Sequence, residues 1–325
     1  MVAEPDDEDH REQLLRRVAH EYWVLGRTQA DIAQAIAFSR PSVSRLLDEA
    51  RRRGVVRFAI GEPVDRDHGR ERALEDLLRT TGPGASALTA CRVVAVLGRT
   101  QAGDQRLLGR RAARVLAGHL APGQVLAVAS SRSVAPVVAS SHLLPPLGAV
   151  VELLGSGRPD RAGRGDPAGA ELAAATGAAH TPVPTAFVHR SPRRAAAARA
   201  RSSVTAALQQ GRDAHAALLG AGSTTRFDGT GAHSPVEAAV LARAARDGAV
   251  GHVLGVFLDA RGRRVPSAVD PLRVGVDPDD LSRVPRRVLL AYGAEKAPVI
   301  RSAVAAGLVT HLVTDVDAAT ALLGG

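Results

Sequence analysis

The chain has 325 residues, of which 45% are hydrophobic but only 2% aromatic, so a sizeable core must be built from alanine, valine and leucine. Its formal net charge of +9 suits a polyanionic partner. A single cysteine, Cys91, excludes an intramolecular disulfide framework, and no apolar run approaches the roughly 20 residues of a membrane helix. The acidic N-terminus also lacks a signal-peptide core. We therefore expect a cytoplasmic protein with no membrane partner.

The charge is unevenly spread along the first part of the chain. Residues 1–10 hold five acidic residues and no lysine or arginine, which predicts a disordered acidic leader. Residues 11–57 hold ten arginines and five acidic residues. This basic excess favours a nucleic-acid partner, although arginine enrichment would also follow from an arginine-biased genome.

Residues 11–60 have the pattern of a helix-turn-helix domain. A first helix is expected over residues 11–25. Thr28 can cap a second helix, with Asp31 in a capping-box position, and Ser39 can cap a third. The third helix carries the apolar stripe Val43, Leu46, Leu47 and Ala50. The turn position that commonly carries glycine is Ala37, so either this turn has a negative φ or Ala37 carries about 1 kcal/mol of strain.

The opposite face of the third helix is polar and basic, as required of a helix that enters a DNA major groove. A helical hairpin that binds nothing would show the same periodicity, but the two caps and the polar face together favour DNA binding. The residues predicted to contact DNA are Thr28, Gln29, Ser39, Arg40, Ser42, Ser44, Arg45 and Arg51.

A linker region is expected over residues 61–84. It follows a short strand at residues 55–60 and contains a short helix at residues 70–78. The glycine- and proline-containing segment 80–86 places the domain boundary near its end. The second domain then covers residues 85–325.

The second domain alternates short apolar runs with helical stretches, which predicts an α/β domain with a mainly parallel sheet covered on both faces. The expected strands are 92–96, 124–129, 149–154, 183–187, 214–220, 250–258, 287–292 and 311–314. The expected helices are 104–120, 134–143, 168–176, 193–210, 235–247, 295–306 and 318–323.

Three loops that follow these strands favour an anionic ligand, because open α/β sheets bind ligands at the carboxyl ends of strands. One is rich in hydroxyl groups and opens a helix, one contains Gly-x-Gly, and one holds Lys296, the only lysine in the chain. We expect a phosphorylated small molecule there, with ordinary turns as the alternative. The predicted effector residues are Ser130, Ser131, Arg132, Ser133, Gly220, Gly222, His252, Gly293 and Lys296, where His252 is a buried or pocket-edge histidine.

Enzymatic function is less well supported. Glu237 and Glu295 have no evident partner for acid–base chemistry, and the 11 histidines show no metal-ligand spacing. No nucleophile elbow or Walker loop is present. We therefore predict no catalytic residue, no metal site and no cofactor. Two alternatives remain: an active enzyme fused to a DNA-binding module, and an architectural DNA-binding protein without a ligand.

The chain resembles the SorC (SorC/DeoR) family of sugar-responsive transcription regulators over nearly its whole length. The resemblance rests on matching segments in both domains, namely residues 39–47, 54–57, 248–251, 258–262, 295–301 and 307–315. It implies a fold like that of sugar-phosphate isomerases and deaminases without their activity. It also implies a homotetramer that binds operator DNA and responds to a phosphorylated sugar. The enzyme alternative is then a catalytically active sugar-phosphate isomerase or deaminase fused to a DNA-binding module.

The sequence departs from the family pattern at three places. The family's loop S-W-G-R-T reads Ala-Ser-Ser-Arg-Ser at residues 129–133, so Arg132 and the hydroxyl of Ser133 carry over. His252 stands where the family commonly has aspartate, and Ala294 follows Gly293 where it has a second glycine. The resemblance therefore implies a phosphate subsite at Arg132 and Lys296.

Overall fold

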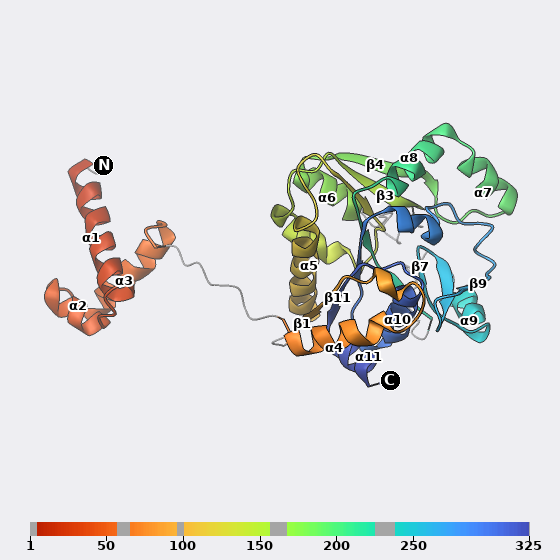
Figure 1. Cartoon of the computed structure of the whole chain (residues 1–325). Coiled ribbons are helices and arrows are strands. Elements are labelled where there is room, and N and C mark those ends of the chain that lie inside the picture. The colour runs from red at the N-terminus through yellow and green to blue at the C-terminus, as the bar shows by residue number, and fades with distance from the viewer. Residues whose placement is uncertain (1–4, 57–65, 96–100, 157–167, 225–237, 325) are drawn as a thin grey trace. The chain divides into compact units, whose positions relative to one another are not determined.

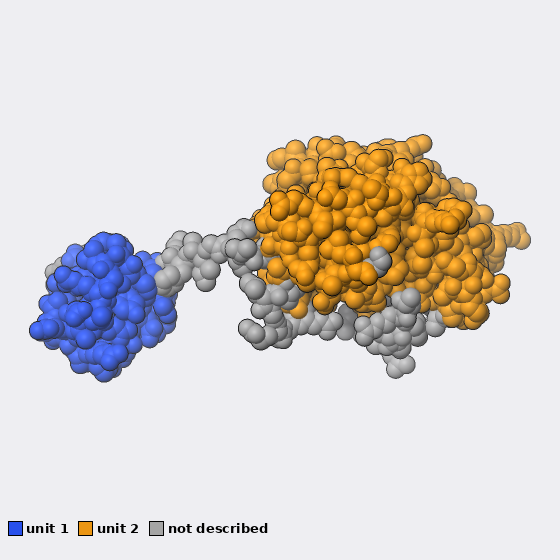
Figure 2. All heavy atoms as spheres, turned by 60° about the horizontal axis from the view of Figure 1, so that its bottom comes forward, with its two compact units in different colours: residues 1–63 blue, residues 64–325 orange. Residues whose placement is uncertain are grey.

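The computed structural model describes residues 5–56, 66–95, 101–156, 168–224 and 238–324. The chain divides into two compact units, residues 1–63 and 64–325 (Figure 2). The expected boundary near residues 80–86 is therefore wrong. Helix α4 (His68–Arg79) belongs to the second unit because its Leu74 and Leu78 are fully buried in the core of that unit.

The first unit contains three helices: α1 (Pro5–Trp23), α2 (Gln29–Ala35) and α3 (Arg40–Arg52) (Figure 1). Its core confirms the expected apolar stripe and consists of Leu15, Val18, Ala19, Ile32, Ala33, Val43, Leu46, Leu47 and Ala50. Residues 5–10 are helical, so the expected disorder of the acidic leader is wrong there. Acidic residues are favourable in the first turns of a helix, where they interact with its dipole.

Both expected helix caps are present. The N–H of Asp31 donates to Thr28 Oγ1 at 3.2 Å, and the N–H of Thr28 donates to Asp31 Oδ2 at 3.2 Å, which completes a capping box. The Thr28 hydroxyl also donates to Asp31 Oδ2 at 2.7 Å, and this bond, together with the one from the Thr28 N–H, lowers the pKa of Asp31. Ser39 Oγ accepts from the N–H of Ser42 at 3.2 Å and starts α3. The strand expected at residues 55–60 lies mostly outside the described residues, and its first two residues form a bend.

The turn between α2 and α3 has a left-handed residue that is not glycine. Ala37 has φ of 54°. Of the two outcomes expected for this turn, the structure shows the strained one, because an L-residue with a side chain is disfavoured at positive φ.

Within the described residues, the second unit is built on a seven-stranded parallel sheet of order β1-β11-β10-β5-β2-β3-β4. This confirms the expected fold class. The strands are β1 (Ala90–Val94), β2 (Val125–Val128), β3 (Ala149–Ser156), β4 (Ala179–Ala186), β5 (Ala216–Leu219), β10 (Arg286–Leu290) and β11 (His311–Asp315).

Helices cover both faces of this sheet. Side chains alternate between two apolar clusters: in β10, Val288 and Leu290 face one cluster and Leu289 the other. One face packs against α5 (Gln101–Ala117), the 3₁₀ helix η2 (Ala135–Leu143) and α6 (Ala168–Thr176). The other packs against α4, α7 (Pro192–Arg199), α8 (Ser202–Arg212), α10 (Ala297–Ala305) and α11 (Val316–Leu323).

A second, antiparallel sheet was not expected from the sequence. It has the order β6-β7-β8-β9, with β6 (Ala221–Ser223), β7 (Ala249–Val253), β8 (Val256–Asp259) and β9 (Arg264–Val265), and α9 (Ala238–Arg246) packs on it. The single strand expected at residues 250–258 is thus a hairpin, which turns at Leu254 and Gly255, both with positive φ. The Gly-x-Gly segment at Gly220 and Gly222, expected as a loop, lies partly in β6.

Three expected helices also differ from the structure. Residues 193–210 form two helices because Arg201 is extended and donates to the carbonyl of Pro184. Residues 134–143 form the 3₁₀ helix η2. Residues 295–306 are divided between η4 (Ala294–Lys296) and α10, since Pro298 lies in the first turn of α10, where proline is best tolerated.

The outer edge of β1 is protected by two glutamates of α4. The N–H of Cys91 donates to Glu75 Oε1 at 2.8 Å, and the N–H of Val93 donates to Glu71 Oε1 at 3.1 Å. Arg66 pairs with Glu71. Carboxylates here take the place of a neighbouring strand's carbonyl groups, which explains why α4 belongs to the second unit.

Replacing Ala37 with glycine should stabilise the first unit by about 0.5 kcal/mol, because glycine adopts positive φ without the Cβ clash. Trp23 is the only tryptophan, so its fluorescence during urea unfolding follows this unit alone. The control Ala35→Gly, in the last residue of α2, should lower stability. If Ala37→Gly unfolds at a lower urea concentration than the wild type, Ala37 is not strained by its positive φ.

Candidate functional site

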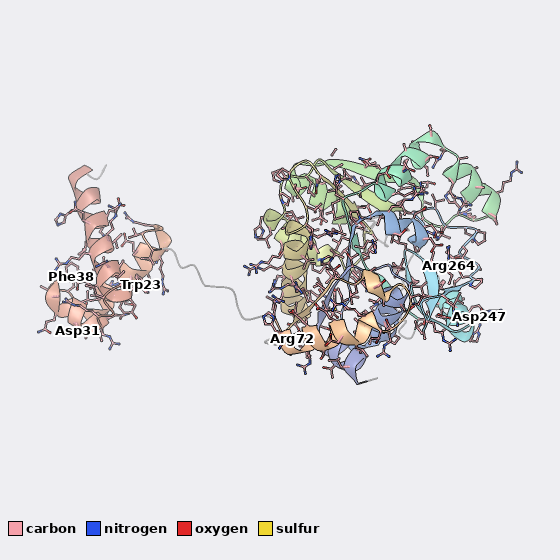
Figure 3. The ribbon with its side chains drawn as sticks, in the orientation of Figure 1. Trp23, Asp31, Phe38, Arg72, Asp247 and Arg264 are labelled. Carbon is pink, nitrogen blue, oxygen red and sulfur yellow. The ribbon has the colours of Figure 1, made fainter. Side chains whose placement is uncertain are left out.

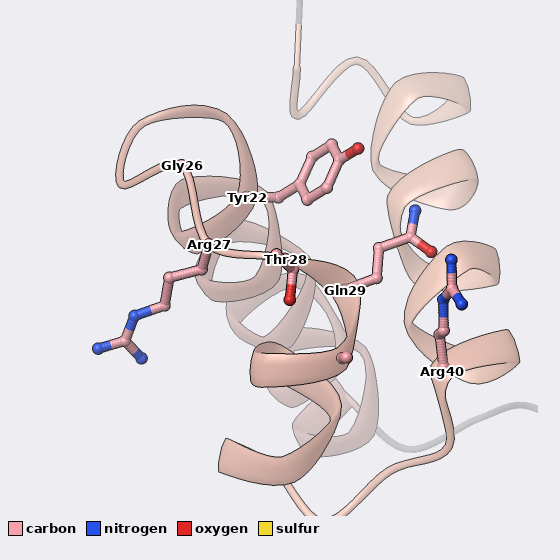
Figure 4. A pocket seen from close by; sticks show the side chains of 7 residues that line it. Tyr22, Gly26, Arg27, Thr28, Gln29 and Arg40 are labelled. Carbon is pink, nitrogen blue, oxygen red and sulfur yellow. The ribbon is translucent and has the colours of Figure 1, made fainter.

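The exposed face of α3 holds the residues expected to read DNA. Arg40 and Arg45 are exposed, and Ser42 and Ser44 are half-buried. A hollow beside α3 is lined by Tyr22, Gly26, Arg27, Thr28, Gln29, Ala30 and Arg40. Figure 4 shows that the side chains of Gln29 and Arg40 point toward one another, whereas Arg27 points away. Gln29 and Arg40 thus form one donor-rich surface across α2 and α3.

Three predicted DNA contacts have roles within the protein. Thr28 and Ser39 cap helices, and the hydroxyl groups of Ser39 and Ser42 lie 2.8 Å apart. The guanidinium group of Arg51 lies over the Trp23 ring, 5.3 Å from its centre, which is a cation–π contact. Figure 3 labels Trp23 in the first unit. We infer that Arg40 and Arg45 are the better placed arginines for DNA.

The second group of predicted residues lies where neighbouring strands end. The loops after β2, β5 and β10 meet because these three strands are adjacent in the sheet. A Cβ added to Gly220 would lie 2.7 Å from Ser131 Oγ and 3.4 Å from Ser133 Cβ. The absence of a side chain at Gly220 therefore allows the loops after β2 and β5 to approach.

Gly222, His252 and Lys296 also come together. Gly222 in β6 pairs with His252 in β7, and a Cβ on Gly222 would lie 2.1 Å from His252 Nε2. Lys296 Nζ donates to the carbonyl of Ala221 at 3.0 Å. Burial and the nearby Lys296 charge lower the pKa of His252 to about 4. The imidazole is therefore neutral at neutral pH and stands beside a cation.

Asp315 positions the loop that carries Lys296. The N–H of Gly293 donates to both carboxylate oxygens of Asp315, at 3.0 and 3.1 Å, and Asp315 also caps α11. Burial raises the pKa of Tyr292, and the charges of Arg132 and Asp315 act on it in opposite directions. Arg132, from the loop after β2, therefore lies within electrostatic range of the loop after β10. Sequence reasoning missed Asp315, although it ends the last strand of the sheet.

Two serines of the loop after β2, Ser130 and Ser131, differ in their hydrogen bonds. Ser130 Oγ donates to Glu152 Oε1 at 2.8 Å and accepts from the N–H of Gly169 at 3.0 Å, so it ties β3 to α6 rather than facing the other loops. By contrast, the buried hydroxyl of Ser131 has no hydrogen-bond partner among the described residues. A ligand that accepts this hydrogen bond would be stabilised there.

Among the described residues, no group of three or more His, Cys, Asp or Glu side chains could hold a metal ion. No helix there is long and apolar enough to cross a membrane. Glu237 lies outside the described residues, and Glu295 is half-buried beside Gly293.

Known proteins resemble this chain over nearly its full length. Residues 86–324 match the family described as "Putative sugar-binding domain". Transcriptional regulator LsrR from Enterobacter sp. is 32% identical over 320 residues, which cover 96% of this chain and 93% of that protein. LsrR from Escherichia coli K12 is 28% identical, with coverage of 96% and 95%.

A solved structure shows the same fold. The full-length sorbitol operon regulator SorC from Klebsiella pneumoniae superposes with a TM-score of 0.74 at 21% identity and covers 96% of this chain and 98% of its own. A transcriptional regulator from Streptococcus pneumoniae TIGR4 has a TM-score of 0.65 at 18% identity, with coverage of 79% and 97%.

The stability of the second unit should fall as the pH drops from 6.5 toward 4. The folded pKa of His252, about 4, lies below the ordinary value of 6.5, so the unfolded chain takes up the proton first. His311, whose pKa is also about 4, adds to this loss. In urea unfolding followed by circular dichroism, His252→Asn should reduce the pH dependence by on the order of 1 kcal/mol.

The exposed His142 supplies the control, since His142→Asn should leave the pH dependence as in the wild type. An equal pH dependence in wild type and His252→Asn would show that His252 does not resist protonation in the folded state.

Proposed function

Because the chain belongs to the SorC family of sugar-responsive transcription regulators, we propose that residues 11–60 bind operator DNA and residues 85–325 bind a phosphorylated sugar that controls this binding. The observation that carries the proposal is the meeting of three loops, with Arg132, the buried Ser131 hydroxyl and Lys296, at one edge of the parallel sheet. In the first unit, the exposed basic face of α3 is the surface that we propose binds DNA.

For DNA, we propose that α3 enters the major groove. Arg40 and Arg45 are exposed, and neither forms an ion pair among the described residues, so both guanidinium groups can reach guanine edges or phosphates. Gln29 lies beside Arg40 and adds an amide (Figure 4). Ser42 and Ser44 supply short hydroxyl groups on the same helix. Thr28, Ser39 and Arg51 are also exposed, and we assign them to holding this surface in place through two helix caps and the contact with Trp23.

For the effector, we propose that the phosphate lies between Arg132 and Lys296. Ser131 and Ser133 donate hydroxyl groups, and Gly220 and Gly222 allow the ligand to approach the backbone. A compact ammonium suits a tight phosphate site better than a guanidinium would. His252, neutral at neutral pH, can exchange hydrogen bonds with sugar hydroxyl groups.

We further propose that the protein is a cytoplasmic homotetramer without catalytic activity. A ligand can change DNA binding only if it binds one arrangement of the protomers better than another. Asp315, a half-buried carboxylate near the loops, accepts hydrogen bonds from the N–H groups of Gly293 and Ala318, so we assign it a role in holding the loop rather than in catalysis. Turnover of ketose or aldose phosphates would instead support the fused enzyme.

Arg45→Ala should weaken binding to the duplex upstream of the chain's own coding sequence by about tenfold and lower the salt slope by about one unit, as expected for one lost phosphate or base contact. Fluorescence anisotropy at several KCl concentrations measures both quantities. Arg72→Ala, which removes the same charge from the exposed face of α4 (Figure 3), should change neither. Equal affinity and slope for wild type and Arg45→Ala would remove Arg45 from the interface.

Lys296→Ala should weaken the binding of a phosphosugar by about tenfold or more, since a charge-assisted hydrogen bond contributes about 1.5–3 kcal/mol. Calorimetric titration with glucose 6-phosphate, fructose 6-phosphate and ribose 5-phosphate gives the affinities. Lys296→Arg keeps the charge and should recover only part of the loss. A phosphosugar that binds wild type and Lys296→Ala equally would place its phosphate elsewhere.

A further inference from the structure

A long basic segment of the second unit contains no acidic residue. Residues 172–212 hold six arginines and no aspartate or glutamate, although the chain has 33 acidic residues in all. The segment runs from the second half of α6 through β4, α7 and α8. Residues 58–325 alone carry a net charge of +9, as much as the whole chain. A sugar-binding unit needs no such excess for its ligand alone.

Three of these six arginines hold the segment in place. Arg199 donates to the carbonyl of Arg273 at 2.7 Å, and Arg201 donates to the carbonyl of Pro184 at 2.7 Å. Arg212 forms an ion pair with Asp280 at 2.8 Å. These contacts give half of the arginines a structural role and leave the other three to be explained.

Arg190, Arg193 and Arg194 together define the α7 surface. All three are exposed, and among the described residues their side chains make no hydrogen bond or ion pair. They lie at the N-terminus of α7, which Ser191 caps by accepting from the N–H of Arg194. Cations oppose the helix dipole at this end, so these arginines do not serve the stability of α7. Figure 1 shows α7 at an outer corner of the second unit.

The charges at this corner are complementary to phosphate. Guanidinium groups bind phosphate oxygens with two parallel hydrogen bonds, and the positive end of α7 adds to the attraction. Two carboxylates of the segment 277–280 are already paired, since Asp280 binds Arg212 and Asp277 binds Arg264 and Arg273. Duplex DNA presents a regular row of phosphates, and a chain that holds DNA through its first unit keeps it at high effective concentration.

We propose that the α7 surface binds the phosphate backbone of duplex DNA, so that the second unit adds a sequence-independent contact to the one made by α3. This inference rests on the proposed DNA binding by the first unit. In this proposal, Arg190, Arg193 and Arg194 increase the affinity for DNA and its dependence on salt, while α3 alone distinguishes one DNA sequence from another.

The test compares two triple variants of the full chain with equal loss of charge. One is Arg190→Gln/Arg193→Gln/Arg194→Gln. The control is Arg72→Gln/Arg246→Gln/Arg261→Gln, which changes three exposed arginines elsewhere on the second unit whose side chains also have no partner among the described residues. The probes are the duplex upstream of the chain's own coding sequence and a scrambled duplex of the same length.

The α7 variant should bind both duplexes about tenfold or more weakly than wild type, with a salt slope lower by about one to three units, because each neutralised phosphate contributes about 0.9. The ratio of the two affinities should stay unchanged. The control variant should match wild type, and all three proteins should share one melting temperature, since the substituted side chains are exposed.

Failure of the inference differs from failure of the proposed function. Wild type that binds neither duplex would overturn both. Wild type that binds DNA with an α7 variant equal to the control would overturn the inference alone. A loss confined to the upstream duplex would also overturn it, since a backbone contact weakens all sequences alike.

Discussion

The candidate ligand site depends on the order of strands in the parallel sheet. The loops after β2, β5 and β10 come from distant parts of the sequence. Because these three strands are neighbours, their carboxyl ends lie side by side and bring the loops together. The approach is close because Gly220 and Gly222 have no Cβ to meet Ser131 and His252. Asp315, at the end of the next strand, then holds the loop that carries Lys296. A change in strand order would scatter these groups.

The composition shapes how the rest of the unit is held together. With few aromatic residues, the core is filled by alanine, valine and leucine, and only Phe187 and Phe257 are aromatic among its largest fully buried side chains. Arginines take on the task of linking loops through carbonyl groups. Arg273 donates to the carbonyls of Leu254 and Val276, and Arg287 donates to those of Val284 and Gly307. Exposed arginines that do not link loops in this way are therefore the better candidates for binding a partner.

Local patterns in the sequence were enough to predict the three helices of the first unit and the alternation of strands and helices in the second. The caps at Thr28 and Ser39 and the stripe on α3 depend on residues within one turn of each other, which a sequence shows directly. The errors came from contacts at long range and from one turn at a residue that is not glycine. Burial of Leu74 moved α4 into the second unit, and the turn at Leu254 converted one expected strand into a hairpin. The hydrogen bond from Ser130 to Glu152 could not be predicted, because Glu152 lies on another strand.

The central claim is that an anion held at the edge of the sheet alters how the first unit holds DNA. The most direct measurement is the affinity of the full chain for the duplex upstream of its own coding sequence, with and without a saturating panel of phosphosugars. We expect at least one phosphosugar to change this affinity in the wild type but not in Lys296→Ala. DNA binding that no phosphosugar changes, in a protein that none of them stabilises against heat, would contradict the account.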